Sequence, residues 1–388
     1  MKKTLMLHLS KVSHVATTTD CWTAHQQSFI GVTAHWTDEE TLERRCAALA
    51  CQRLKGSHTF AVLAGALDDI HCQYRIRGKV VRTTTDFIKA FSVFGEQSQP
   101  EEAELESDQD FSGETKADYL DTFTILEQDS GLEYQLPPHE RCACHLLNLV
   151  AITDAAKAGE MNDAYKRLSR AAFGKCQAIW NKSGQSYMEA EIVESECKFP
   201  LIRPTQTRWN SRYTALERII RIIQEKGEDA TRNVCEKFKV KMLSPAEIAF
   251  LTDYCTMMKP VVKALNSLQS ETNTHMGWLL PVIFQLKAKL SRLETSTKMC
   301  LPLIRAIQDG VQKRFGGMME DPELIAAAIL LPKSTWTERP DIIEAGLIYV
   351  RQHLDQMAEA GVEQVKQHSS DEEDFFSIKS KRPQGFFF

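Results

Sequence analysis

The spacing of hydrophobic and polar positions changes near residue 145 and predicts two kinds of structure. Before that point, β-branched and apolar segments bounded by turn residues predict strands at 14–19, 28–36, 41–54 and 79–85. Short turns separate the first three, which predicts an antiparallel meander. Residues 59–70 carry apolar side chains at helical spacing after a candidate N-cap at Ser57, and a short helix is expected at 87–94. We therefore expect an α/β domain here.

Beyond residue 145 the pattern is helical to about residue 364. The clearest apolar seam alternates spacings of four and three, through Trp209, Tyr213, Leu216, Ile220 and Ile223. A capping box with a first-turn proline, Ser244-Pro245-Ala246-Glu247, opens another helix. Further helices are expected at 278–293, 301–315, 322–331 and 340–357. The second part of the chain is therefore predicted to be all-α.

The net charge of −5 hides an uneven distribution. Residues 96–121 hold ten acids and one base, and residues 371–374 are four consecutive acids, so the rest of the chain carries about +8. We expect an acidic disordered loop at 96–136 and a disordered tail at 369–388. A basic body is compatible with a nucleic-acid partner, although acidic loops are also common in proteins without one.

Composition excludes several classes of protein. No apolar run approaches the roughly 18 to 20 residues that span a bilayer, so no membrane partner is expected. The N-terminal apolar stretch at 5–9 is too short for a secretory signal. The 11 cysteines are odd in number and lie mostly in apolar segments, which indicates a reducing compartment and an intracellular, soluble protein.

Two aspartates follow runs of three threonines, at Asp20 and at Asp86. If the two preceding strands are neighbours in one sheet, both carboxylates lie at the same end. Converging carboxylates hold hard divalent ions such as Mg²⁺ or Mn²⁺, and two-metal sites serve phosphoryl transfer. An aspartate after a strand is also an ordinary turn or N-cap residue, and spacing alone favours this second interpretation.

Cys142, Cys144 and His145 stand together at the start of a predicted helix. A structural zinc ion normally needs four ligands from paired clusters, and no second Cys or His pair has the required spacing. The pattern therefore favours a thiol and an imidazole packed at a helix start.

Arg203, Arg208 and Arg212 surround Trp209 where the clearest seam begins. Arginine binds phosphate, and an aromatic ring can stack on an unpaired base. The same residues also fit a tryptophan that heads an apolar seam with arginines on its solvent side. Periodicity alone does not separate these interpretations.

Ser369 and Ser370 precede the four consecutive acids of the tail, a context that acidophilic kinases favour. Phosphorylation would add about −1.5 to −2 charge at each serine. An unmodified, solvated tail fits the sequence equally well.

Taken together, these segments resemble the hAT superfamily of transposases, and within it the domesticated proteins of the zinc-finger BED type. The resemblance rests on four blocks: 17–23 with 29–36, then 81–86, 141–149 and 207–218. They occur in family order and cover roughly residues 12–290.

The resemblance implies an RNase H-like α/β core at 1–95 and 137–158, interrupted by a long helical insertion at 159–368. The family hydrolyses and transfers DNA strands with metal ions held by an acidic triad. By matching, Asp20 and Asp86 take the first two triad positions. Cys142 and His145 match a motif that shapes the active site and its DNA contacts. Trp209, flanked by Arg208 and Arg212, matches the tryptophan that stacks on a flipped base.

The sequence departs from the family pattern at three places. Asp86 runs directly into an apolar segment at 87–91, where the family has a short polar run. The family's third acid and its dimerisation segment lie in a C-terminal block, and residues 371–377 resemble only the linker before it. No BED finger precedes Asp20. We therefore expect an incomplete core, no enzymatic activity and no bound cofactor.

The expected function is that of a transposase-derived nuclear protein that retains DNA binding, with chromatin proteins as further partners and a monomeric state. One alternative is an active metal-dependent DNA endonuclease that borrows its third acid from the tail or a partner chain. Another is a helical interaction scaffold without a nucleic-acid role.

Overall fold

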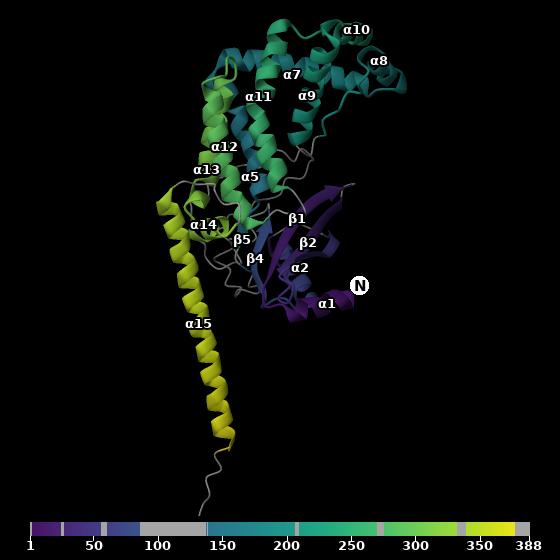
Figure 1. The fold of residues 1–388 in the computed structure, drawn as a ribbon. Helices are drawn as coiled ribbons and strands as arrows, with labels where there is room; N and C mark the ends of the chain where they lie inside the picture. Colours follow the sequence, from purple (N-terminus) through teal and green to yellow (C-terminus); the bar gives the residue numbers. More distant parts are fainter. Residues whose placement is uncertain are drawn as a thin grey trace, which may run out of the picture. The chain divides into compact units, whose positions relative to one another are not determined.

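The computed structural model describes residues 2–24, 27–55, 60–85, 137, 139–205, 209–269, 275–331 and 339–376. The chain divides into two compact units, Met1–His145 and Leu146–Phe388, which are described separately here (Figure 1). Mixed α/β structure in the first unit and helices in the second confirm the predicted general fold class. Within the described ranges, no helix is long and apolar enough to cross a membrane.

The first unit is built on a five-stranded sheet. The order β3-β2-β1-β4-β5 comprises β1 (Val15–Ala24), β2 (Gln27–Thr37), β3 (Arg44–Leu54), β4 (Val80–Thr85) and β5 (His139–Arg141). The first three strands form the predicted antiparallel meander. Strands β4 and β5 run parallel to β1, after the helix α2 (Phe60–Tyr74). Strand β5 was not predicted, since three residues are too few for a strand pattern. The N-terminal helix α1 (Lys2–Lys11) was not predicted either.

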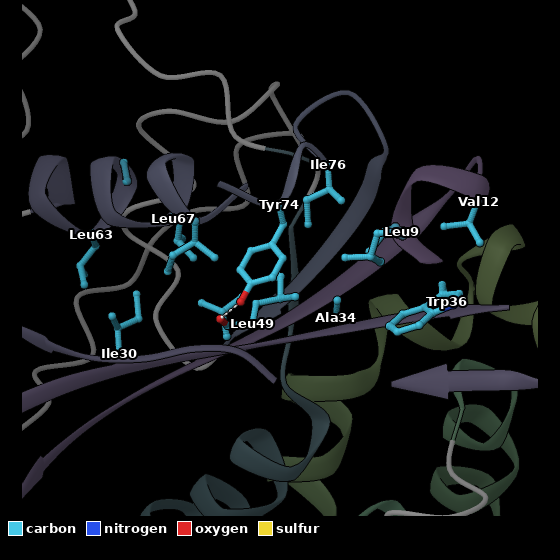
Figure 2. Close-up of a cluster of buried hydrophobic side chains, with 14 of the residues drawn as sticks. Leu9, Val12, Ile30, Ala34, Trp36, Leu49, Leu63, Leu67, Tyr74 and Ile76 are labelled. Atoms are coloured by element: carbon cyan, nitrogen blue, oxygen red, sulfur yellow. Dashed lines mark hydrogen bonds between the residues drawn. The ribbon is translucent and has the colours of Figure 1, made fainter. Parts of the chain in front are cut away.

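One face of this sheet is buried against α1 and α2 (Figure 2). Because side chains alternate along a strand, every second residue of β2 points into this core: Ile30, Val32, Ala34 and Trp36. Helix α2 contributes Leu63, Leu67 and Ile70 at helical spacing. The Tyr74 hydroxyl donates a hydrogen bond to the Leu49 carbonyl at 2.7 Å, so its polar end is satisfied inside the core.

Lys79 fixes the end of α1 beside the start of β4. Its Nζ donates to the backbone carbonyls of Leu9, Ser10 and Val12 at 3.0, 2.9 and 2.8 Å. These carbonyls belong to the last turn of α1 and the residue following it, where a helix leaves acceptors without intrahelical partners. One ammonium group therefore caps the helix and positions it under the sheet.

The second unit is helical, as predicted. It contains α5 (Ala143–Leu149, beginning before the division), the π-helix η1 (Val150–Asp154), α6 (Ala158–Met161), α7 (Asp163–Ser183), α8 (Tyr187–Cys197), α9 (Trp209–Lys226), α10 (Glu228–Phe238), α11 (Pro245–Leu268), η2 (Met276–Trp278), α12 (Leu279–Glu294), α13 (Leu301–Phe315), η3 (Gly317–Met319), α14 (Pro322–Ile329) and α15 (Pro340–Phe376). The predicted capping box opens α11, where Ser244 and Glu247 bond reciprocally.

One predicted helix end differs from the observed one. Helix α15 was expected to end at Met357 but continues to Phe376, so Ser369 and Ser370 belong to this helix. Residues 358–376 contain no proline and are rich in alanine, glutamate and glutamine, which sustain a helix across the single Gly361. The two compact units divide after His145, and the assignment of residues 137–158 to the core stays a prediction.

A buried ion pair joins the start of the second unit to α13. Asp154 ends the π-helix η1, and its Oδ2 lies 2.7 Å from Nε of Arg314. The two side chains are 1% and 6% exposed. Lys157 Nζ contacts the other carboxylate oxygen at 2.9 Å. Gly310 makes room for this arrangement, since a Cβ there would lie 2.6 Å from Oδ2 of Asp154.

Substituting Asp154→Ala should destabilise the second unit strongly, because it removes the buried carboxylate that lies against the Arg314 guanidinium. Breaking such a pair costs about 3–5 kcal/mol. Urea unfolding of the full chain, followed by circular dichroism, measures the change. Asp309→Ala serves as the control, since Asp309 is an exposed acid on α13, the helix that carries Arg314. It should change the free energy of unfolding by less than about 0.5 kcal/mol. Equal stability of the two variants would contradict this account of the ion pair.

Candidate functional site

The two threonine runs lie on neighbouring parallel strands, as the candidate acidic site requires. Thr17 pairs with Thr83, Thr18 with Thr84 and Thr19 with Thr85. On the buried face, the hydroxyls of Thr17 and Thr83 are 2.7 Å apart, so they share a hydrogen bond where no water reaches. This pairing fixes the register of β4 against β1. Asp20 and Asp86 follow its last described pair, Thr19 and Thr85.

Asp20 lies inside β1 rather than at its end. The strand was predicted to stop at Thr19 but continues to Ala24, because residues 20–24 keep pairing with β2. Asp20 stands opposite Gly31 and is exposed, on the face opposite the buried side chains of Thr17 and Thr19. This position excludes the turn and N-cap interpretations for Asp20. Asp86, the predicted helix at 87–94 and the acidic loop at 96–136 lie outside the described residues.

An aromatic pair lies on the same face of the sheet as Asp20. Trp22, two residues further along β1, stacks on its cross-strand partner Phe29 with ring centroids 5.8 Å apart. The Trp22 ring also covers Gly31, where a Cβ would come within 2.9 Å of it. Trp22 remains 38% exposed. In the sequence Trp22 stands out only as part of a motif, although alternation along β1 predicts that it shares a face with Asp20.

The thiol beside Asp20 is unsuited to nucleophilic chemistry. Burial, and secondarily the Asp20 carboxylate, raise the pKa of Cys21 to about 12. The thiolate is the reactive form of cysteine, so Cys21 is protonated at neutral pH. The chemistry available at this point of β1 is therefore that of the carboxylate.

Strand β5 brings a carboxylate that sequence analysis missed. Glu140 pairs in register with Thr84 and forms a salt bridge with Arg82 of β4. Both side chains are about one quarter exposed. The only sequence signal for Glu140 was its place just before the cysteine and histidine block, in a strand of three residues.

The cysteine and histidine block follows β5 directly. The Cys142 backbone N–H donates to the Thr85 carbonyl at 3.2 Å, and α5 then begins at Ala143. Cys142, Cys144 and His145 are half-buried. In the described part of the chain, no three His, Cys, Asp or Glu residues form a group that could hold a metal ion. The Cys142 backbone therefore lies beside the end of β4, and the role of Cys142 and His145 in a site stays a prediction.

The predicted nucleic-acid residues of the second unit stand at the start of α9. Trp209 is the first residue of this helix. Arg208 and the Trp209 side chain lie outside the described part. The Arg212 guanidinium stacks over the Phe173 ring of α7, with its central carbon 4.7 Å from the ring centroid. Arg212 remains exposed, so the contact orients its guanidinium without burying it.

Hydrogen bonds tie the loop before α9 to the helix. The Thr205 N–H donates to Oγ of Ser211 at 3.0 Å, while the Ser211 hydroxyl donates to the Thr205 carbonyl at 2.9 Å. Nδ2 of Asn210 donates to Oδ1 of Asn266 on α11 at 3.0 Å. The buried seam of α9 includes Tyr213, Leu216, Ile220 and Ile223, as predicted. The start of α9 is therefore held on a packed scaffold.

Comparisons with known proteins support the resemblance to hAT-type transposases. The chain is 26% identical over 230 residues to a Zea mays protein named as an AC9 transposase, covering 58% of this chain and 24% of that protein. It is 27% identical over 207 residues to a Zea mays protein named as an AC transposase, covering 53% and 22%. No family model matches the chain.

A shorter similarity links the chain to a protein of Talaromyces stipitatus named as the transcriptional regulator tpeD. The two are 33% identical over 86 residues, which is 22% of this chain and 10% of that protein. The chain spans about a quarter of the length of the maize relatives and less of this one.

His139, at the start of β5, should remain neutral in the folded protein well below pH 6. Burial lowers its pKa to about 4, against the opposing effect of a hydrogen bond with the Thr85 backbone. An unfolded histidine titrates near 6.5, so the unfolded state takes up the proton first as pH falls. The contribution of His139 to the free energy of unfolding is therefore fully present above about pH 6.5 and is lost progressively as the pH falls towards 4.

Nuclear magnetic resonance of the histidine rings, assigned with His139→Gln, measures this directly. The His139 signals should stay constant between about pH 7 and 5. The Gln variant should show a smaller loss of unfolding free energy over the same interval. A titration midpoint for His139 near 6.5 would show that the ring is not desolvated.

Proposed function

We propose that this chain is a transposase-derived nuclear protein that binds DNA but does not cut it. In this proposal the first unit is an RNase H-like core and the second is a helical insertion. The observation that carries the assignment of this core is the position of Asp20, exposed on the central strand β1 beside the parallel strand β4. A mixed sheet with an antiparallel meander and two added parallel strands is compatible with such a core.

The similarities to known proteins add support for a role on DNA. Two relatives are named as transposases, and a third is named as a transcriptional regulator. Each similarity covers a quarter or less of the relative. DNA binding, chromatin partners and a nuclear location are therefore proposals for this chain. They rest on its own motif residues, such as Trp209, and on the names of these relatives.

The proposed lack of cleavage follows from the carboxylates available. Two-metal phosphoryl transfer needs several carboxylates that converge on the ions. Motif matching supplies Asp20 and Asp86, and Asp86 runs into an apolar segment that departs from the family pattern. Glu140 on the next strand is paired with Arg82, which offsets its charge. These residues do not make a favourable site for two divalent ions, so no resident Mg²⁺ or Mn²⁺ is proposed.

Incubation of the purified chain with supercoiled or hairpin-ended DNA and Mg²⁺ or Mn²⁺ tests this proposal. We expect no metal-dependent strand cleavage above that of the Asp20→Asn variant. Asp69→Asn, which changes an exposed acid on α2, is the matched control. Cleavage that Asp20→Asn abolishes and Asp69→Asn preserves would establish the active endonuclease instead.

Binding should depend on Trp209 when the DNA offers an unpaired base. Base stacking on an aromatic side chain is worth about 1–3 kcal/mol, so Trp209→Ala should weaken binding to single-stranded or flipped-base DNA by roughly 5- to 160-fold. Plain duplex should be affected less. Tyr187→Ala, at an aromatic residue 91% exposed on α8, should leave both affinities unchanged. Fluorescence anisotropy with labelled oligonucleotides measures the two affinities of the original protein and of each variant.

A helical interaction scaffold is the second candidate function. One observation favours it: α15 exposes the apolar side chains of Ile343, Leu347, Leu354 and Met357, whose spacings of four, seven and three residues place them on one face of the helix. Undetectable DNA binding, or binding that does not change with salt, would leave this alternative in place of the first.

A further inference from the structure

Phe199 gathers three cations around one aromatic ring. It follows α8 and is half-buried, packed in the cluster that contains Val193, Ile222 and Val234. The guanidinium carbons of Arg218 and Arg221 lie 5.8 and 5.2 Å from the ring centroid, and the Lys226 ammonium lies 5.2 Å from it. All three cations belong to α9, whereas Phe199 comes from the segment before it. These four residues are called the Phe199 cluster below.

Among the residues that the structure describes, the cations of the Phe199 cluster outnumber the acids bonded to them. Arg221 Nε contacts Glu225 at 2.6 Å, which offsets one charge. An Arg218 guanidinium N–H points to the Pro200 carbonyl at 3.5 Å, an uncharged acceptor. Glu196 of α8 is engaged elsewhere, by Lys237 at 2.5 Å and Asn233 at 3.0 Å. The three cations thus converge with an excess of positive charge, and an anion placed among them would relieve their repulsion.

We propose that the Phe199 cluster binds the phosphate backbone of duplex DNA. The inference rests on the proposed DNA-binding function and adds a second contact surface to it. Arginine matches phosphate with paired N–H donors, and lysine adds a point charge. Arg221 is exposed, with about half of its side chain open to solvent, so it can meet a phosphate without rearranging the core. The ring of Phe199 holds the cations in place on the protein side.

The position of the cluster along α9 sets the length of DNA required. Arg218 and Lys226 follow Trp209 by nine and seventeen residues, or about 14 and 26 Å along the helix axis. Phosphates recur about every 3.4 Å along one strand of a duplex. A duplex that runs along α9 from an unpaired base at Trp209 therefore reaches the cluster about four to eight base pairs further on.

The test is a salt titration of binding to a 16-base-pair duplex with one unpaired terminal base. Affinity for DNA falls as salt rises, and each phosphate contact contributes about 0.9 to the steepness of log affinity against log salt. The triple variant Arg218→Gln, Arg221→Gln, Lys226→Gln should therefore make this dependence shallower by about 2 to 3. A second triple variant, Lys259→Gln, Lys289→Gln, Arg292→Gln, removes the same charge from exposed positions on α11 and α12 and should keep the slope. Circular dichroism checks that both variants are folded.

DNA length supplies an independent readout. The original protein should bind the 16-base-pair duplex more tightly than one of four base pairs, and the cluster variant should lose this preference while keeping its dependence on Trp209. If the triple variant does not fold, Lys226→Gln alone, at an exposed position, should lower the slope by about 1.

The possible outcomes separate the two proposals. A folded cluster variant with an unchanged salt slope and length preference overturns the Phe199 inference and leaves DNA binding standing. A slope lowered equally by the cluster variant and the control variant also overturns it, because the effect is then one of net charge. No binding by the original protein to either DNA overturns both proposals.

Discussion

The hydrogen bond between the hydroxyls of Thr17 and Thr83 joins the two central parallel strands from inside the core. Parallel pairing needs a crossover, here the segment that contains α2, and its register has no hairpin turn to set it. A slip of β4 by one residue against β1 would separate the two buried hydroxyls, and each would then face apolar side chains or solvent. Because the hydroxyls would lose their shared hydrogen bond, such a slip is costly. The exposed face depends on the same register, since Asp20, Thr84 and Glu140 face outward only while the inner threonines face inward.

Sequence patterns predicted those parts of the fold in which neighbouring residues determine the structure. The meander, α2 and the helices of the second unit follow from alternation, helical spacing and capping residues such as Ser244. The length of β1 did not follow, because Asp20 has low strand propensity and only pairing with β2 carries the strand past it. Strand β5 is three residues long and exists through its partner β4, so its register and the salt bridge of Glu140 could not be read locally.

The sequence indicated which residues could form a site, but it revealed little about how their side chains are arranged in space. The threonine runs left open whether the strands before Asp20 and Asp86 are neighbours, and the pairing of β1 with β4 shows that they are. The contact of Arg212 with Phe173 and the gathering of cations at Phe199 join residues from different helices. Aromatic rings that organise arginines in space leave no periodic signal in a sequence, so only the folded chain reveals them.

The π-helix at Val150–Asp154 makes the chain sensitive to length at this point. A π-helical turn corresponds to one extra residue within an α-helix. Deleting a residue there would restore regular α-helical geometry but turn every following side chain by about 100° around the axis. Asp154 would then leave the space opposite Gly310, and the helix that carries it would have to rotate about its axis to restore the contact with α13. Related chains that keep this ion pair should therefore also keep the extra residue, whatever their surface sequences become.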